Sequence, residues 1–399
     1  MTQREDFFWA GGASSLAIEG AGRRSDYARW ESASNIEASA DGNGFRERFA
    51  DDFALFSAHG LRAIRLTVEW ARLEPFPGRI DHEELEHLQQ VFTAANEAGL
   101  DVWTTLHHGS LPGWFSEDTT GFRTNDGPSI HWSRHVDRVA ELFDHFTAVW
   151  APIEDPIGWA IRGHHLGTRP PRRRSTAESR EEVQNGLVGI LDATFDAHRL
   201  LASGDTPVVG TFTVPTLHAV EPAAQAERAW WDHVYWKSWT QAITDGVLEW
   251  PWSSPTERPD AADAFTAIGI GIAAPIAVQP DGTFSAWPAA GRRDPSGFAP
   301  LPEQLADVIQ RAAEALPEKD LVVTGLGVVS ADDDWRAELF ERWLDQIFSA
   351  VEDGVPIRGV VLDPVIDGYS EVAGAHIDAG VFTRDREPKP SFRWIEAQQ

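Results

Sequence analysis

Short apolar and β-branched runs alternate along the chain with segments whose apolar residues recur at helical spacing. Eight of these runs are expected to form strands, at residues 6–12, 61–70, 101–108, 146–155, 206–215, 265–273, 320–327 and 355–363. Because strands that alternate with helices build parallel sheets, eight such units favour a closed (β/α)8 barrel, the TIM barrel. The pattern alone also allows two α/β domains.

Two of the intervening segments show the helical pattern clearly. In residues 81–100 the apolar residues share one helical face, Asp81 is placed to cap the first turn, and Gly99 is placed to end the helix. Near the C-terminus, apolar residues recur at every fourth position in Leu339, Trp343 and Ile347. Both segments are therefore expected to pack as helices against the strands.

Two longer segments are expected to be loops. Residues 277–303 are rich in Gly and Pro and are expected to leave the sixth strand as a long excursion. Residues 167–182 contain a basic cluster formed by Arg169, Arg172, Arg173 and Arg174. The cluster could bind an anion, but a solvated loop that pairs with nearby acids is the favoured interpretation. Neither segment resembles a domain boundary, so residues 1–399 are expected to form a single barrel domain.

Composition narrows the functions that such a barrel could have. Of the 399 residues, 42% are hydrophobic, and 62 Asp and Glu against 34 Lys and Arg give a formal charge of -28. This charge repels phosphate backbones and anionic membranes, so neither nucleic acid nor a membrane is an expected partner. The chain has no cysteine, and no apolar run has the length of a signal-peptide core or a membrane span, so a cytoplasmic location is expected.

A barrel of this class is expected to carry its chemistry at the C-terminal ends of the strands. His107 and His108 end the third predicted strand, and Glu154 and Asp155 end the fourth. Adjacent residues of a strand point to opposite faces, so one member of each pair is expected to face the mouth of the barrel. Because adjacent histidines point apart and cysteine is absent, no metal site and no cofactor are expected.

Arg65 lies on the second predicted strand and is expected to point into the barrel. An unpaired buried charge is strongly unfavourable, so Arg65 needs a carboxylate partner. Asp155 and Glu69 are the two candidates that the sequence offers for this role.

Five stretches of the chain resemble, in order, motifs of glycoside hydrolase family 1, the β-glucosidase family. These stretches are FFWAGGASSLAIEGA, AIRLTVEWARLEP, TLHHGSLPGWF, WAPIEDPIGWAIRGHHLGTRP and GVFTRDREPKPSFRW. The resemblance covers almost the whole chain. It implies a (β/α)8 barrel whose enzymes hydrolyse β-glycosides with retention, using one glutamate as the acid/base and a second as the nucleophile.

The chain departs from the family pattern at both catalytic positions. The Asn-Glu-Pro motif that holds the acid/base reads Glu154-Asp155-Pro156 here, so the acid is one methylene shorter, whereas proton transfer needs heavy atoms at about 2.6–3.2 Å. The Thr-Glu-Asn-Gly motif that holds the nucleophile reads TGLG at 324–327. Gly325 therefore stands where the resemblance places the nucleophile, and it has no side chain with which to attack.

The sugar-binding positions that the resemblance implies have changed as well. The chain has Ala17 for a Gln, Gly109 for the Trp after the conserved His108, Leu326 for the Asn of the nucleophile motif, Gly271 and Ile272 for an Asn-Tyr pair, Asp363 for a Trp, and Ser370 and Glu371 for a Glu-Trp pair. Each lost hydrogen bond is worth about 0.5–1.5 kcal/mol, so recognition of an unmodified hexose is expected to be weak. The smaller residues are expected to enlarge the pocket.

Two hypotheses follow from these changes. In the first, the chain is an enzyme in which Asp155 is the acid and Asp363, Glu371 or Glu154 the base of an inverting hydrolase, or in which His108 and Asp155 move protons in an elimination, isomerisation or cyclisation. In the second, an inactive barrel binds a ligand or another protein without turnover. The expected ligand is a small glycoside or a modified, partly apolar metabolite. Further residues expected to contact it are Arg65, His107, Trp114 and Ser370.

Overall fold

The computed structural model describes residues 7–12, 14–118, 121–123, 130–171 and 174–396. Its centre is built from eight parallel strands: β1 (Phe8–Gly12), β2 (Ala63–Thr67), β3 (Asp101–Thr105), β4 (Val149–Trp150), β5 (Val209–Thr213), β9 (Ala267–Gly271), β12 (Asp320–Leu326) and β13 (Ile357–Leu362). Their order is β4-β3-β2-β1-β13-β12-β9-β5, and bridges from Trp150 to Val208 and from Glu154 to Thr211 close the sheet. Each strand lies within a predicted run, so the (β/α)8 barrel is confirmed.

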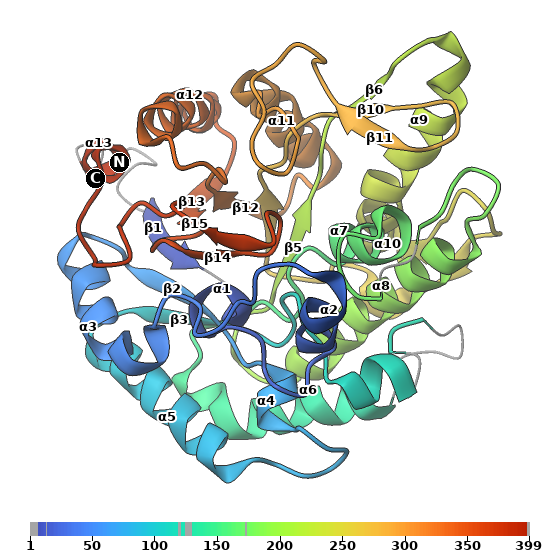
Figure 1. Cartoon of the computed structure of the whole chain (residues 1–399). Helices are drawn as coiled ribbons and strands as arrows, with labels where there is room; N and C mark the ends of the chain where they lie inside the picture. Colours follow the sequence, from blue (N-terminus) through green and yellow to red (C-terminus); the bar gives the residue numbers. More distant parts are fainter. Residues whose placement is uncertain (1–6, 13, 119–120, 124–129, 172–173, 397–399) are drawn as a thin grey trace.

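Helices ring the outside of the barrel (Figure 1). The long ones are α3 (Phe45–Ala58), α5 (His82–Glu97), α6 (Ile130–Phe143), α8 (Glu181–Leu201), α11 (Leu305–Ala315) and α12 (Asp333–Glu352). Shorter ones are α4 (Trp70–Leu73), α9 (Gln225–Asp232), α10 (Ser238–Asp245) and α13 (Pro390–Glu396). Within the described ranges, no helix combines the length and apolarity that crossing a membrane requires.

The helical patterns read from the sequence are found in α5 and α12. The carboxylate of Asp81 accepts hydrogen bonds from the backbone N–H groups of Glu83 and Glu84, which confirms the predicted cap of α5. In α12 the three residues of the predicted face are buried: Leu339, Trp343 and Ile347. These faces pack against the barrel and hold its strands in place.

Apolar side chains pack the inside of the barrel. One buried cluster joins residues of six strands: Ala10, Ala63, Trp103, Val209, Val322 and Val361. An eight-stranded barrel is just wide enough for side chains to fill, so this interior is a core and leaves no channel for a ligand. Chemistry is therefore placed at the C-terminal ends of the strands, here called the mouth.

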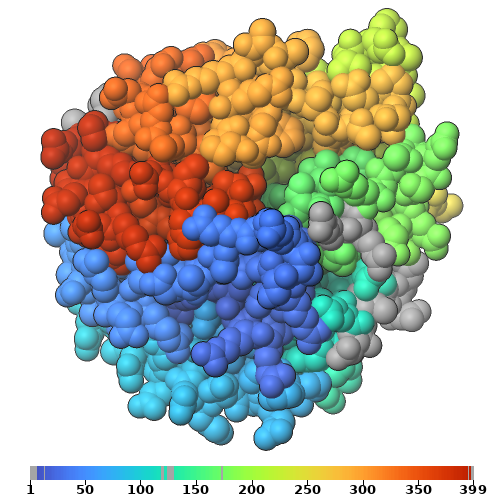
Figure 2. All heavy atoms as spheres, in the orientation of Figure 1, coloured from blue at the N-terminus to red at the C-terminus, as the bar shows by residue number. Residues whose placement is uncertain are grey.

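Short elements cover the mouth. They are α1 (Ser15–Glu19), α2 (Asp26–Ser34), α7 (Pro156–Ile161) and a hairpin of β14 (Gly368–Ser370) and β15 (Ala375–Ile377). All of them lie in front of the barrel in Figure 1. On the same face, Figure 2 shows the blue N-terminal, green middle and red C-terminal parts of the chain meeting. Residues far apart in the sequence therefore form the rim of the mouth.

Of the two segments predicted as loops, residues 277–303 are more ordered than expected, whereas the described part of 167–180 is a loop. Residues 277–303 include most of β10 (Ile276–Val278) and all of β11 (Phe284–Ala286), which form a three-stranded sheet with β6 (Leu217–Ala219). A second small hairpin joins β7 (Val247–Leu248) and β8 (Thr256–Glu257). In residues 167–182, Arg169 pairs with an acid as expected, namely Glu371, but it is only 5% exposed, so the expectation of a solvated arginine was wrong there. Arg174 is exposed, and Arg172 and Arg173 lie outside the described residues.

Candidate active site at the mouth of the barrel

Arg65 extends from β2 into the barrel, and its side chain is 1% exposed. Its Nη1 lies 2.7 Å from Oε2 of Glu154, which follows β4, and its Nη2 donates to the carboxylate of Asp363, which follows β13. In the strand order β4 and β13 stand on opposite sides of the barrel. Arg65, Glu154 and Asp363, here called the Arg65 cluster, therefore span the mouth.

The partners proposed from the sequence for this arginine were wrong. Asp155 pairs with Arg162 at 2.8 Å, and Glu69 pairs with Arg72 at 2.7 Å. Glu154 continues the strand direction of β4, whereas Asp155 has a left-handed backbone with a φ of 48° and begins α7. This change of backbone direction sends the two adjacent carboxylates to different arginines.

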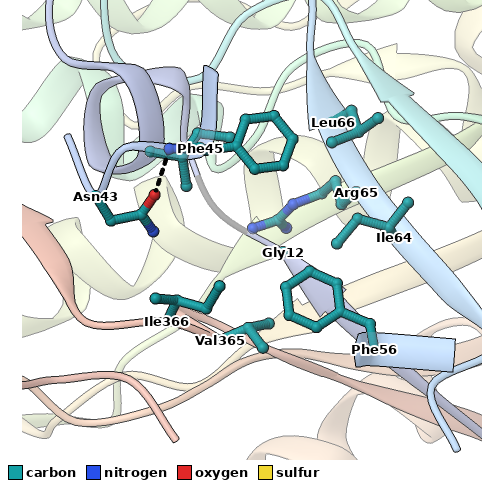
Figure 3. Close-up of a pocket in the computed structure, with 10 residues that line it drawn as sticks. Gly12, Asn43, Phe45, Phe56, Ile64, Arg65, Leu66, Val365 and Ile366 are labelled. Atoms are coloured by element: carbon teal, nitrogen blue, oxygen red, sulfur yellow. Dashed lines mark hydrogen bonds between the residues drawn. The ribbon is translucent and has the colours of Figure 1, made fainter. Parts of the chain in front are cut away.

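An apolar pocket lies beside the side chain of Arg65, and Figure 3 shows the guanidinium next to Gly12. The walls of the pocket include Phe45, Phe56, Val365 and Ile366. Such surroundings strengthen an ion pair but make an unpaired charge costly. In the described part of the chain, Nε of Arg65 has no hydrogen-bond partner, so this cation depends on its two carboxylates.

Asp363 has an unusual acidity for an aspartate. Burial raises the pKa of Asp363 to about 6, against the lowering effect of Arg65 and with a further rise from the charge of Glu154. A carboxyl group with a pKa near the working pH can both give and take a proton. Asp363 therefore satisfies the acidity requirement of a general acid or base.

The predicted acid, Asp155, lies at the mouth but is held by three hydrogen-bond donors. Its Oδ1 accepts from the backbone N–H of Gly158 at 3.0 Å, as the N-cap of α7, and from that of Thr213 at 3.4 Å. Its Oδ2 accepts from Arg162 at 2.8 Å. Asp suits this place because it caps helices well and tolerates left-handed backbone. These contacts give Asp155 a structural role, and its catalytic role stays a prediction.

The two adjacent histidines are both held neutral, in different surroundings. His107 packs against Trp159 and Phe122, with ring centroids 5.2 and 5.6 Å apart, and burial lowers the pKa of His107 to about 3. This ring belongs to the aromatic packing beneath the mouth. Burial lowers the pKa of His108 well below its usual range, and Arg65 lowers it further. Within the described residues, the buried Nδ1 of His108 has no hydrogen-bond partner, and contact of His108 with a ligand stays a prediction.

Three glycines of the mouth differ in the space beside them. A Cβ built on Gly325 would meet no atom of the described residues within 4 Å. A Cβ on Gly271 would collide with Thr213, and one on Gly109 would lie 2.9 Å from both carboxylate oxygens of Glu371. Of these three positions, the expected enlargement of the pocket is found at Gly325 alone. At the other two, side chains from elsewhere in the chain fill the space.

Arg162 and Arg169 also belong to the mouth, although the sequence analysis placed neither in the site. Nη2 of Arg169 donates to Glu371, which follows β14. Burial lowers the pKa of Arg169 to about 9, and the charge of Arg162 adds to this effect. Arg162 follows Asp155 by seven residues, about two helical turns, and that spacing could have identified the pair. No comparable signal separates Arg169 from its neighbouring arginines.

The remaining predicted residues occupy packing and turn positions. Trp114 is buried, and its indole N–H donates to the backbone carbonyl of Glu74 at 3.0 Å. The hydroxyl oxygen of Ser370 accepts from the N–H of Ala373 within the hairpin turn. Ala17 lies in α1, and Leu326 and Ile272 pack in the core around the barrel. Ligand contacts by these residues stay predictions.

Comparison with known proteins supports the resemblance seen in the motifs. The family model Glycosyl hydrolase family 1 matches residues 1–225. β-Glucosidase A of Thermotoga maritima is 21% identical over 440 residues, covering 98% of this chain and 96% of that protein. A solved β-glycosidase from Pyrococcus horikoshii superposes with a TM-score of 0.85 at 21% identity, covering 99% of this chain and 93% of its own. Hydroxyisourate hydrolase of Glycine max is 25% identical over 189 residues, which are 43% of this chain and 32% of that protein. The chain belongs to glycosyl hydrolase family 1.

Proposed function

We propose that the protein acts on a glycoside or a related sugar-derived metabolite at the mouth of the barrel, without forming a covalent glycosyl-enzyme. Family membership supports a sugar-derived ligand, and a β-glucosidase of Thermotoga maritima has been solved in complex with deoxynojirimycin. One observation carries the second half of the proposal. Gly325, where the resemblance places the attacking glutamate, has no side chain, and a Cβ built on it would meet no described atom within 4 Å. Hydrolysis would then proceed by direct attack of water.

Two carboxylates on opposite sides of the mouth supply the proton transfers in this proposal. Asp363 follows β13 and Asp155 follows β4, which are opposite strands of the barrel. Asp363, with its pKa of about 6, protonates the leaving oxygen as the glycosidic C–O bond breaks. Asp155 takes a proton from the water whose oxygen bonds to the anomeric carbon, and the anomeric configuration inverts. These roles reverse the sequence-based assignment, because the oxygens of Asp155 already act as hydrogen-bond acceptors.

Product analysis tests this mechanism. Proton NMR of a digest of 4-nitrophenyl β-glucoside should show the α-anomer first, and intact-protein mass spectrometry with an activated 2-deoxy-2-fluoro glucoside should show no adduct. Asp155→Asn and Asp363→Asn should each remove the product. Asp320→Asn, from an exposed pair with Arg358, is the matched control and should keep it. A stable glycosyl adduct, or the β-anomer as first product, would refute the proposal.

A binding role without turnover is the second candidate, and one observation favours it. Every one of the four mouth carboxylates is already paired with an arginine. These carboxylates are Glu154 and Asp363 on Arg65, Asp155 on Arg162, and Glu371 on Arg169. A carboxylate that is paired with an arginine can orient a polar ligand, but the ion pair keeps it from taking part in proton transfer. A rise in melting temperature with deoxynojirimycin, together with no product from a broad glycoside panel, would support binding and reject hydrolysis.

A further inference from the structure

Glu371 occupies space at the mouth that a side chain at residue 109 would otherwise fill. Both of its carboxylate oxygens lie 2.9 Å from the place of a Cβ on Gly109, and Arg169 donates to one of them. The backbone of Gly109 has a φ of 104°, which residues with a side chain rarely adopt. A carboxylate therefore fits over bare backbone and against a buried cation.

The pair joins a fixed cation to a carboxylate on a surface turn. The side chain of Glu371 is 13% exposed, it directly follows β14, and its neighbour Val372 is 58% exposed. Of the other three mouth carboxylates, Asp363 directly follows β13, and Glu154 and Asp155 lie in the short link between β4 and α7. Surface turns open locally at a lower free energy than core strands do. Among the four, Glu371 is thus the carboxylate that can leave its arginine by a local movement.

Three arginines surround this part of the mouth. Burial lowers the pKa of His108, and the positive charges of Arg65, Arg169 and Arg162 lower it further. If Glu371 left Arg169, a buried guanidinium would lose its ion-pair partner, which is strongly unfavourable. Another anion in the same place would remove that penalty.

We propose that Arg169 binds a carboxylate group of the ligand, and that Glu371 occupies this anion subsite until the ligand displaces it. The inference rests on the proposed function and deepens it, because it names the ligand class: a sugar acid or its glycoside. Exchange of one carboxylate for another keeps the charge-assisted hydrogen bonds of the guanidinium. The hairpin turn that carries Glu371 is then free to rearrange around the ligand.

The surroundings of Arg169 favour a carboxylate over a phosphate. A phosphate group carries about -1.5 to -2 charges at neutral pH. The carboxyl groups of Asp26 and Asp155 lie close enough to Arg169 to act on its charge. Asp26 is buried, and its carboxylate accepts from the backbone N–H of Leu111 at 2.9 Å. These neighbouring carboxylates would repel a second negative charge on the ligand, whereas Arg169 already holds the single charge of Glu371.

Calorimetric titration of the full chain with D-glucuronate and with D-glucose tests the subsite. Glu371→Gln removes the competing charge, so the Kd for glucuronate should fall by about tenfold or more, while glucose binding should not change. Arg169→Gln should abolish glucuronate binding, and Arg169→Lys, which keeps the charge, should retain part of it. Glu303→Gln, from an exposed pair with Arg342, is the matched control and should bind as the unmodified protein does.

Each result decides one question. The subsite is overturned if Glu371→Gln and the unmodified protein bind glucuronate with equal affinity. It is also overturned if neither of them binds glucuronate. A larger gain for glucose 6-phosphate than for glucuronate overturns the carboxylate assignment. Melting curves of every variant verify that the fold is kept. A different result rejects the proposed function: no binding of deoxynojirimycin and no turnover of any glycoside. That result does not depend on whether glucuronate binds.

Discussion

Replacing Arg65 with Met should destabilise the protein by about 3–5 kcal/mol at neutral pH, the usual cost of removing one partner of a buried ion pair. Met is similar in length and apolar, so it suits the pocket beside residue 65. The variant would leave the carboxylates of Glu154 and Asp363 facing each other without a cation. The loss should shrink as the pH falls toward about 6, because without Arg65 the pKa of Asp363 rises further and its carboxyl group takes up a proton.

This free energy corresponds to a measurable shift in melting temperature. An unfolding entropy of about 2.1 cal/mol/K per residue gives roughly 0.8 kcal/mol/K for 399 residues. The melting temperature should therefore fall by about 4–6 °C. Differential scanning calorimetry at one scan rate measures the shift, and near-ultraviolet circular dichroism shows whether the tryptophan packing melts with it.

Two variants separate the effect of the Arg65 cluster from a general effect of losing an arginine. Arg342→Met breaks an exposed pair with Glu303 and should cost at most about 1 kcal/mol. Combining Arg65→Met with Glu154→Gln and Asp363→Asn should restore most of the stability, because no buried charge is then left unpaired. Equal shifts for Arg65→Met and Arg342→Met would show that the buried charges of the cluster do not carry this stability.

Three further predictions concern single residues of the mouth. The pKa of Asp363 is about 6 in the folded protein and about 3.9 in the unfolded chain, so the free energy of unfolding should fall by roughly 3 kcal/mol as the pH rises from about 4 to about 6. Paired urea titrations of the unmodified protein and Asp363→Asn should show that the variant lacks this loss. Gly325→Ala should cost about 1–2 kcal/mol, since its φ is 69°, and an unchanged urea midpoint would contradict this. The free energy of unfolding of Asp155→Ala should be about 1 kcal/mol lower than that of Asp155→Asn, because Asn keeps the cap of α7.

The fold was predictable because its signals are local and repeated. Each barrel strand is rich in apolar residues, all but β1 include β-branched ones, and each lies where the pattern placed it. The cap at Asp81 was predictable for the same reason, since a capping side chain acts on backbone within three residues. The hairpin of β10 and β11 was missed, because its Gly and Pro content is also typical of an irregular loop.

The site was predictable in its residue types but not in its pairings. Which of two adjacent carboxylates faces Arg65 depends on where β4 gives way to α7, and a left-handed residue such as Asp155 at that point cannot be read from apolar periodicity. The space over Gly109 was expected to be empty, because the residue that fills it, Glu371, comes from the opposite end of the chain. Sequence motifs thus located the mouth, while its charge pairs needed the three-dimensional arrangement.

The substitutions at the mouth compensate one another in charge and in volume. The resemblance places a negative charge at residue 325 on β12, and this chain has a carboxylate at Asp363, directly after the adjacent strand β13, where it pairs with Arg65. Residue 109 lacks a ring, and Glu371 fills the space. Unpaired buried cations and empty cavities each cost several kcal/mol, so a barrel that loses such groups keeps its stability when others replace them. Both replacements put a carboxylate where the resemblance places an aromatic ring, and the proposed sugar-acid ligand would exchange with one of them, Glu371, at Arg169.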